Sequence, residues 1–587
     1  MRNIKRLWGN INTSHRIRLA FLLLLMSLSS LAEIASIGAI APFLAALTSP
    51  EYIFQHELMV QVNSFLGIQE PEDLLYPLTF IFIMSIILST LLKVSLLWLQ
   101  TQAIHIINTD NSSSIYKRVM YQSYDNHLSR NSSEIIAAIV TKSNALLANL
   151  LHPVLAIINA VLMIVMALFL IIAIDPKVLL IFPLVVLIYI LILIMMKKSL
   201  LKYSNIINYE SSHIIKIIQE SFGIIRDIII DRTQSFYLKI FYKAEYRNQN
   251  ARSKIKIISG MPRLIIEPAG MIIIVLLSYY YIQKIENPLV IIPFLGMLAL
   301  GAQRLLPIIQ SVYTSISSIR GGHKQVEEGL DLLDLKLPNL IIKTEKDVHP
   351  ILFNKHIKLT NINFNYPSEN HKVLQNLDLT IKKGERLGII GPTGSGKSTL
   401  LDLILGLLIP TSGEIFIDDV RIDNNNILEW HKNLAHIPQD VYISDNTIYE
   451  NIALGVDYNK IDKDIVHNAA EQAKIASSIL SMKKGFDTIV GENGSFLSGG
   501  QRQRIGIARA LYKKANVIML DEATSALDDK TEKEVLAEVC SLSGDITVIM
   551  ITHRLSALKS FDKIVKISEG RIVQIGSYSE VVHSLNI

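Results

Sequence analysis

GPTGSGKS, residues 391–398, is the stretch that decides the fold of the second half of the chain. An apolar run at 387–390 precedes it, and another apolar run follows from residue 400 onward. This is the pattern G-x-x-x-x-G-K-S between a predicted strand and a predicted helix, where glycines let backbone N–H groups and the helix N-terminus face phosphate oxygens. Lys397 suits the β- and γ-phosphates, and the Ser398 hydroxyl suits Mg²⁺. The stretch therefore predicts an α/β P-loop nucleotide-binding domain with ATP and Mg²⁺ as ligands.

A carboxylate pair follows a second apolar run in VIMLDEAT, residues 517–524. Asp521 ends the predicted strand, where it can hold the Mg²⁺ shell. Glu522 comes next and is predicted to act as the general base toward the attacking water. The alternative is a solvated loop carboxylate. Together the two motifs predict an ATPase.

A third motif, LSGGQ at residues 497–501, lies between the other two. It is letter for letter the signature of the ATP-binding cassette (ABC) family, which the last 240 residues of the chain resemble over essentially their whole length. The resemblance implies that Tyr366 stacks on adenine, that Gln439 contacts Mg²⁺ or water, and that His553 meets the γ-phosphate. It also matches SALD, residues 525–528, to the D-loop of the family.

The resemblance implies a homodimer with two equivalent ATP sites, because in this family the signature of one chain closes over nucleotide held by the other. The predicted catalytic residues are Glu522, His553 and Gln439, and the predicted Mg²⁺ ligands are Ser398, Gln439 and Asp521. The predicted ATP-binding residues are Tyr366, Gly391, Pro392, Thr393, Gly394, Ser395, Gly396, Lys397, Ser398, Thr399 and Asp521. The signature residues, expected to act in trans, are Leu497, Ser498, Gly499, Gly500 and Gln501; the D-loop residues are Ser525, Ala526, Leu527 and Asp528.

The first half of the chain is apolar. Half of the 587 residues are hydrophobic and the mean hydropathy is +0.35. A helix needs about 20 apolar residues to cross a bilayer, and we predict six such spans, at about 19–47, 76–102, 151–174, 178–196, 264–283 and 289–309. The expected organisation is a membrane α-helical domain at 1–325, a linker at 326–350 and an ABC nucleotide-binding domain at 351–587. Six spans ahead of one cassette resemble a type I ABC exporter half-transporter.

Lysine and arginine are distributed unevenly between the predicted loops. Residues 48–75 contain none, whereas the long loops at 103–150 and 197–262 are rich in both. By the positive-inside rule both termini are cytoplasmic, and we expect the long loops to extend helices on that side. Together with the resemblance, this predicts an integral protein of the bacterial inner membrane. The net charge of +5 is too small for this length to indicate a nucleic-acid partner.

Charged residues inside the predicted spans bear on the cargo, since intramembrane charges are costly. Lys93, Arg263 and Arg304 are candidates for lining a cavity that attracts an anionic headgroup. A helical rise of about 1.5 Å per residue puts Glu267 level with Lys93 and Arg304, so we expect it to pair with them. Arg263 then lies a turn nearer the cytoplasm without an obvious mate. The alternative is that these charges form structural ion pairs.

The strings MPRLIIEPAG (261–270) and AQRLLP (302–307) resemble membrane helices of lipid-linked oligosaccharide flippases, the PglK-like group. That group carries arginines here that are thought to meet the pyrophosphate of a polyprenyl carrier. We therefore predict an ATP-driven exporter or flippase for an amphipathic, anionic lipid-linked saccharide or lipid. Two alternatives stay open: a peptide or drug exporter, and an ATP-gated membrane channel or regulator.

Overall fold

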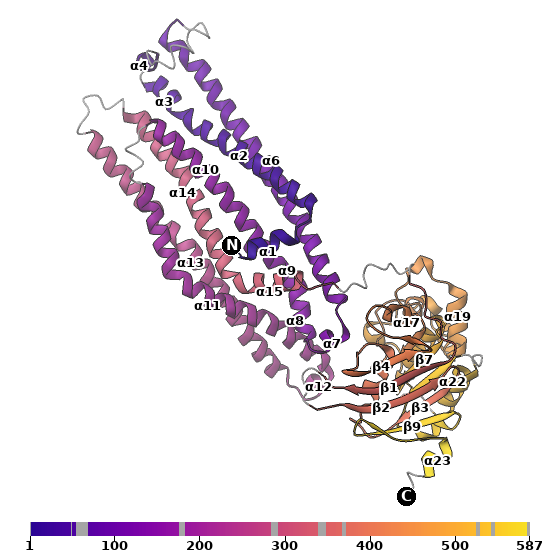
Figure 1. The fold of residues 1–587 in the computed structure, drawn as a ribbon. Helices are drawn as coiled ribbons and strands as arrows, with labels where there is room; N and C mark the ends of the chain where they lie inside the picture. Colours follow the sequence, from indigo (N-terminus) through magenta and orange to yellow (C-terminus); the bar gives the residue numbers. More distant parts are fainter. Residues whose placement is uncertain are drawn as a thin grey trace. The chain divides into compact units, whose positions relative to one another are not determined.

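The computed structural model describes residues 2–48, 50–54, 69–174, 182–282, 291–337, 348–366, 371–523, 529–541 and 546–583. It divides into two compact units. The first comprises Met1–Tyr121 and Arg130–Lys336, and the second comprises Gln122–Ser129 and Leu337–Ile587. The first unit is helical, and the second carries the β-strands (Figure 1).

Long helices dominate the first unit, because apolar stretches long enough to span a membrane continue as helix into more polar segments. α6 (Leu75–Met120), α11 (Phe182–Gly223) and α13 (Gln234–Ile282) have 46, 42 and 49 residues. The predicted loops at 103–150 and 197–262 are therefore largely helical, as expected. The other helices of this unit are α1 (Arg2–Asn10), α2 (Thr13–Gly38), α3 (Ile40–Thr48), α4 (Pro50–Phe54), η1 (Pro71–Leu74), α8 (Ser132–Ala137), η2 (Ala138–Lys142), α9 (Ser143–Leu146), η3 (Leu147–Leu151), α10 (His152–Ile174), α12 (Ile225–Ile230), α14 (Ile291–Gly321) and α15 (His323–Leu333).

Three helical stretches of the described chain are long and apolar enough to cross a membrane: Thr13–Thr48, Pro71–Met120 and Ser132–Phe169. They contain the first two predicted spans and most of the third. The other three predicted spans run into residues 175–181 and 283–290, which lie outside the described residues. Their described parts belong to α11, α13 and α14.

The last helix of the first unit, α15, is fixed to the bundle at both of its faces. Leu330 is fully buried in a core that also contains Met26, Ile107 and Leu146. On the other side, Arg6 of α1 pairs with Asp331 at 2.7 Å and with Asp334 at 2.6 Å. The N-terminal helix α1 is therefore part of this unit's packing.

The second unit contains two sheets. The smaller is antiparallel in the order β2-β1-β4-β5, and the larger has the order β10-β9-β3-β8-β7-β6, in which β9 to β6 pair in parallel and β10 is antiparallel. The strands of the second unit are β1 (His356–Phe364), β2 (Leu374–Lys382), β3 (Arg386–Ile390), β4 (Ser412–Ile417), β5 (Val420–Arg421), β6 (Leu434–Ile437), β7 (Val517–Asp521), β8 (Thr547–Ile551), β9 (Lys563–Ser568) and β10 (Arg571–Gly576). Its helices are α7 (Tyr124–Leu128), α16 (Lys397–Leu405), α17 (Ile427–His431), α18 (Ile448–Ile452), η8 (Tyr458–Lys460), α19 (Lys463–Gln472), α20 (Ala476–Leu480), η9 (Gly485–Asp487), η10 (Glu492–Gly494), α21 (Gly499–Tyr512), α22 (Asp529–Ser541), η11 (Leu555–Leu558) and α23 (Tyr578–His583).

The central strands of the larger sheet are buried on both faces, which explains their uninterrupted apolar sequences. In β7, Val517 and Met519 belong to one buried core, whereas Ile518 and Leu520 belong to the other. Such strands present loops only at their ends, and ligands of parallel sheets bind beyond the carboxyl ends. The site is assembled there.

Candidate functional site

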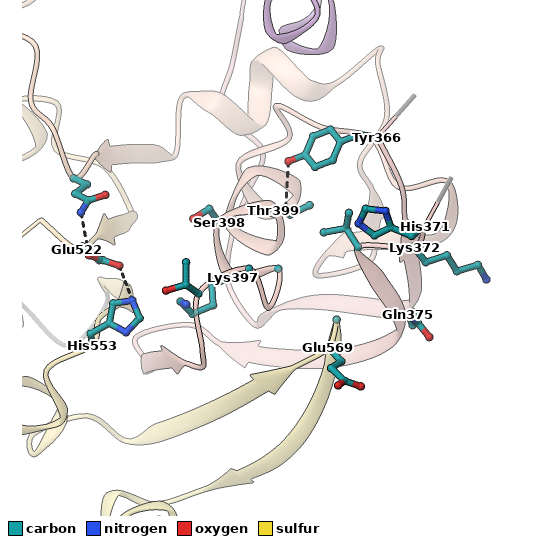
Figure 2. A pocket seen from close by; sticks show the side chains of 16 residues that line it. Tyr366, His371, Lys372, Gln375, Lys397, Ser398, Thr399, Glu522, His553 and Glu569 are labelled. Carbon is teal, nitrogen blue, oxygen red and sulfur yellow. Dashed lines mark hydrogen bonds and ion pairs between the residues drawn. The ribbon is translucent and has the colours of Figure 1, made fainter. Parts of the chain in front are cut away.

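A cavity of about 850 Å³ lies in the second unit beyond the carboxyl ends of the parallel strands (Figure 2). The segments that reach it follow β3, β6, β7 and β8 in turn. Predicted residues that line it are Tyr366, Thr393, Gly394, Gly396, Lys397, Ser398, Thr399, Gln439, Glu522 and His553; unpredicted ones are His371, Lys372, Val373, Gln375, Glu569 and Gly570. The structure thus brings together motifs that are up to 187 positions apart in the chain, from Tyr366 to His553.

The phosphate loop needs its glycines for backbone conformation and for space. Gly396 has φ +96°, and a Cβ atom there would lie 2.7 Å from Leu374 Cδ2. Gly391 has φ +158°, and a Cβ atom would lie 2.2 Å from the Ile567 carbonyl oxygen. Any larger residue at either position would therefore displace the phosphate loop, whose backbone N–H groups and following helix N-terminus are expected to face phosphate oxygens.

Lys397 is buried at the start of α16, and its Nζ donates to the carbonyl oxygens of Gly391 and Pro392, each at 2.9 Å. Burial lowers the pKa of Lys397, while the nearby carboxylates of Glu522 and Asp521 act in the opposite direction. Burial also raises the pKa of Asp521, the Glu522 charge raises it further, and Lys397 opposes both. One cation and two carboxylates thus interact beside the phosphate loop.

The Glu522 carboxylate is held from two sides. Gln439 Nε2 donates to its Oε2 at 3.1 Å. His553 Nε2 lies 3.1 Å from its Oε1 (Figure 2). The backbone of Glu522 is left-handed, with φ 48°, and its N–H donates to the Ile551 carbonyl oxygen at 3.0 Å. The three predicted catalytic side chains therefore form one hydrogen-bonded group.

Tyr366 lies at the other end of the cavity from Glu522 (Figure 2). Its hydroxyl lies 3.2 Å from Thr399 Oγ1, and its ring packs edge-on against Phe364 with centroids 5.0 Å apart. His371 and Lys372 flank it and are exposed to the cavity. Sequence reasoning missed these two because no motif marks them.

Glu569 and Gly570 were missed as well, although they also line the cavity. They belong to the turn between β9 and β10, so only the pairing of the sheet brings them to the site. Gly570 itself has φ +73°, and its N–H donates to the Ser395 carbonyl oxygen of the phosphate loop at 3.2 Å. This turn therefore helps to hold the phosphate loop in place through a backbone hydrogen bond.

The signature begins a helix. Ser498 caps α21: its Oγ accepts from the Gln501 N–H at 3.2 Å, and Gln501 Oε1 accepts from the Ser498 N–H at 2.9 Å. Leu497 is buried, whereas Ser498 is exposed. Among the described lining residues of the cavity, none belongs to the signature. The predicted D-loop residues Ser525, Ala526, Leu527 and Asp528 lie outside the described residues.

The donor set near the phosphate loop fits Mg²⁺, which prefers oxygen ligands. Ser398 exposes its hydroxyl to the cavity, and the Asp521 carboxylate interacts with neighbouring Lys397. Gln439 uses its amide nitrogen on Glu522, so its amide oxygen is available for a cation. These three residues would hold the ion together with phosphate oxygens.

The charged residues of the first unit differ from expectation. Arg263 Nε donates to Glu267 Oε2 at 3.0 Å, so the prediction that Arg263 lacks a mate is wrong. The two residues are four apart on α13, which places both on one helix face. Lys93 pairs with Glu33 of α2 rather than with Glu267. The backbone of Arg304 lies in α14, but its side chain lies outside the described ones.

The fold and the cavity together define a class: a helical membrane domain with an α/β P-loop domain, the type I ABC exporter fold. The family model for the ABC transporter transmembrane region matches residues 20–298, and the ABC transporter model matches residues 374–525. The chain therefore belongs to the ABC transporter family, and the predicted family and fold class are confirmed.

Three comparisons illustrate the similarity. The ATP-dependent lipid A-core flippase of Ralstonia nicotianae is 39% identical over 227 residues, 38% of each chain. The heterocyst differentiation ATP-binding protein HepA of Nostoc sp. is 32% identical over 393 residues, 66% of this chain and 63% of that one. The match thus spans less than two thirds of either relative. The solved structure of a bacterial Atm1-family ABC exporter with ATP bound has a TM-score of 0.78 over 98% of this chain and 97% of that one, at 22% identity. This last match shows a shared fold.

Proposed function

We propose that this chain is one half of an ATP-hydrolysing exporter or flippase. The observation that carries the proposal is the Glu522 carboxylate, held at 3.1 Å by both Gln439 and His553 beside the phosphate loop. A carboxylate fixed in this way next to a P-loop lysine suits a general base in phosphoryl transfer to water.

In this mechanism the loop N–H groups and Lys397 hold the terminal phosphates of ATP. Glu522 accepts the proton of the attacking water, and each of its oxygens retains a lone pair for this purpose beside its hydrogen bond. Gln439 and His553 orient the carboxylate. Bound Mg²⁺ would supply charge neutralisation at the phosphate oxygens.

The working unit in this proposal is a homodimer in the bacterial inner membrane, with both termini in the cytoplasm. The exposed Ser498 and the N-terminus of α21 support it, because a capped helix N-terminus is a receptor for an anion. The linker predicted at 326–350 begins too early, because α15 (His323–Leu333) packs in the first unit, which extends to Lys336. We therefore propose that the first domain includes α15 and that the nucleotide-binding domain begins near residue 351. The family resemblance implies that the D-loop residues 525–528 also belong to the contact between the two copies.

The proposed cargo is an amphipathic lipid with an anionic head, such as a lipid-linked saccharide. The lipid class is supported by relatives whose name is ATP-dependent lipid A-core flippase. The anionic head has weaker support, because Arg263 and Lys93 each have a carboxylate partner. Lys93 still exposes 45% of its side chain, whereas Glu33 exposes 10%, so the pair presents mainly its cation.

Reconstitution of the full chain in liposomes tests the proposal. We expect ATP-dependent movement of polyprenyl-pyrophosphate sugars or phospholipids and stimulation of ATPase activity by the transported species. Glu522→Gln should abolish both. Movement of peptides or drugs alone would contradict the proposed lipid cargo and favour a peptide or drug exporter. ATP-gated ion conductance without vectorial transport would contradict the exporter and favour a channel or regulator.

A further inference from the structure

A small groove lies between the N-terminal helix α1 and the cytoplasm-proximal ends proposed for two spans. It encloses about 90 Å³, and every one of its eleven lining residues is apolar. Ile4 and Trp8 come from α1, Leu19 comes from α2, and Val154 and Ile158 come from α10. The groove therefore lies where an amphipathic helix meets two membrane-crossing stretches.

The groove has a buried floor and an exposed rim. Leu7, Leu19 and Leu150 are each at most 4% exposed, whereas Ile4 and Trp8 are 41% and 47% exposed. Exposed apolar side chains of this size are costly in water, but they are expected at the level of lipid headgroups, where tryptophan is enriched. An alkyl chain is the occupant that matches such a lining.

A cation lies at the rim beside the apolar wall. The guanidinium of Arg16 lies over the Trp8 ring at 5.5 Å from its centroid. Its Nε donates to the Ile11 carbonyl oxygen at 3.1 Å, and its Nη2 donates to the Trp8 carbonyl oxygen at 2.9 Å. A guanidinium carries five N–H donors, so Arg16 is fixed in place with donors left for an anion.

The charged residues in the surrounding sequence are all basic. Residues 1–32 contain five lysines and arginines and no aspartate or glutamate. Arg6 is bound by Asp331 and Asp334, but Arg2, Lys5 and Arg18 are exposed. Each exposed basic residue near an anionic leaflet strengthens binding, so charge complementarity selects an anionic lipid over a zwitterionic one.

We propose that this groove binds one anionic phospholipid, with an acyl chain between α1, α2 and α10 and its phosphate at Arg16. Neither Lys93 nor Arg263 lines this groove, and the proposal does not depend on the cargo. A lipid bound there would join the N-terminal helix to two spans and add to the contact of α1 with α15.

Trp8 provides a direct probe. The full chain is reconstituted in phosphatidylcholine vesicles that contain either brominated phosphatidylglycerol or brominated phosphatidylcholine. The chain has three tryptophans, so the Trp8 signal is the difference between the native chain and Trp8→Phe. We expect brominated phosphatidylglycerol to quench this signal at about a fivefold lower mole fraction, the effect of one cation near a membrane surface.

Two kinds of variant separate the headgroup from the acyl chain. Arg16→Gln, or the exposed Lys5→Gln should Arg16→Gln not fold, is expected to remove the preference for phosphatidylglycerol. Val154→Phe fills the groove and should reduce quenching by both lipids, whereas Val161→Phe, at a 48% exposed position of the same helix, should not. Thermal unfolding checks that each variant is folded.

Three results would overturn the proposal. They are equal quenching by the two brominated lipids, quenching unaffected by both Arg16→Gln and Val154→Phe, and displacement of the brominated phosphatidylglycerol by inorganic phosphate. The last result would mean that an anion alone occupies the site and that the groove plays no part.

Discussion

Glu522 combines a catalytic geometry with a strained backbone. A non-glycine residue in the left-handed region costs about 1–2 kcal/mol relative to its usual conformations. Its φ of 48° is maintained by the hydrogen bond to Ile551 and by the contacts of its carboxylate with Gln439 and His553. The strain is located at the residue that the proposed mechanism requires to be fixed.

Glu522→Gln should therefore keep the geometry of the site and remove its basicity. We expect ATP binding to persist while hydrolysis falls by a factor of about 10²–10⁴, the usual contribution of a general base. Equilibrium dialysis measures ATP binding, and steady-state phosphate release measures hydrolysis, so the two expectations are checked separately. Glu471→Gln, at an exposed position of α19, is the control and should hydrolyse ATP normally. Turnover close to native in Glu522→Gln would remove Glu522 from its role.

Asp402 makes the stability of the second unit depend on pH. Burial raises its pKa to about 6, and the Asp521 charge adds to the shift. An aspartate in the unfolded chain titrates near 3.9, so between about pH 4 and 6 the folded state binds more protons. Stability contributed by the protonated form is thus lost as pH rises through this window, and the loss is complete above the folded pKa.

Asp402→Asn should therefore stabilise the second unit above pH 6, by about 1 kcal/mol after discounting for partial exposure of the carboxylate. The gain should vanish below about pH 4, where the native aspartate is protonated in both states. Thermal unfolding of the full chain at several pH values measures this. Asp445→Asn, at an exposed loop position, is the matched control. A gain that is independent of pH would point to a packing effect instead.

Motif spacing predicted the phosphate loop and the residues around Glu522 because each motif is contiguous and its backbone is constrained by glycine or by a strand end. His371 and Glu569 reach the same cavity through strand pairing, which a single sequence does not reveal. The contact between Arg263 and Glu267 was predictable from their spacing of four. Comparing depth between helices led instead to the wrong partner for Lys93, since depth says nothing about which faces of two helices meet.

At the scale of elements, the region before α10 departs from a regular helix. The π-helical segments η2 and η3 flank α9, and such segments are rare and frequently functional. Gly329 of α15 fits against them: a Cβ atom there would lie 3.1 Å from the Lys142 carbonyl oxygen and from Leu146 Cγ. Hydrophobic periodicity predicted a helix here, but it could not indicate the π segments, because they change the hydrogen bonding and not the apolar pattern.

Lys142 ends η2 and joins it to α15 through an ion pair. Its side chain is 7% exposed, and its partner Glu328, at 28%, also accepts from Asn208 Nδ2 at 2.7 Å. Lys142→Met should destabilise the first unit by about 2–3 kcal/mol, somewhat less than for a fully buried pair, because Glu328 would lose its counter-charge. The loss should appear as a lower unfolding temperature of the full chain in detergent.

Adding Glu328→Gln to Lys142→Met should recover most of that loss, since the amide oxygen can still accept from Asn208. Lys216→Met provides the contrast: Lys216 and Glu220 are 48% and 60% exposed, and such surface pairs contribute about 0–1 kcal/mol. A double variant no more stable than Lys142→Met would show that the lysine acts through packing and not through its charge.

For the whole molecule, the proposed homodimer rests on the relation between the cavity and the signature. Among the described lining residues the cavity takes none from the signature, although both belong to the second unit. Ser498 is nevertheless exposed at the N-terminus of α21, a position where a helix can bind an anion. In the proposed homodimer a second copy of the chain would complete the site, an arrangement that a single sequence suggests only through family resemblance.

Mixed dimers test this arrangement, with Lys397→Ala disabling the phosphate loop and Ser498→Arg disabling the signature. If each site takes its signature from the other chain, one Lys397→Ala chain paired with one Ser498→Arg chain places both defects in the same site and leaves the second site intact. Both substitutions on one chain, paired with a native chain, damage both sites. We therefore expect ATPase activity in the first pairing to exceed that in the second, measured on dimers purified through two different tags. The reverse order would mean that each chain completes its own site.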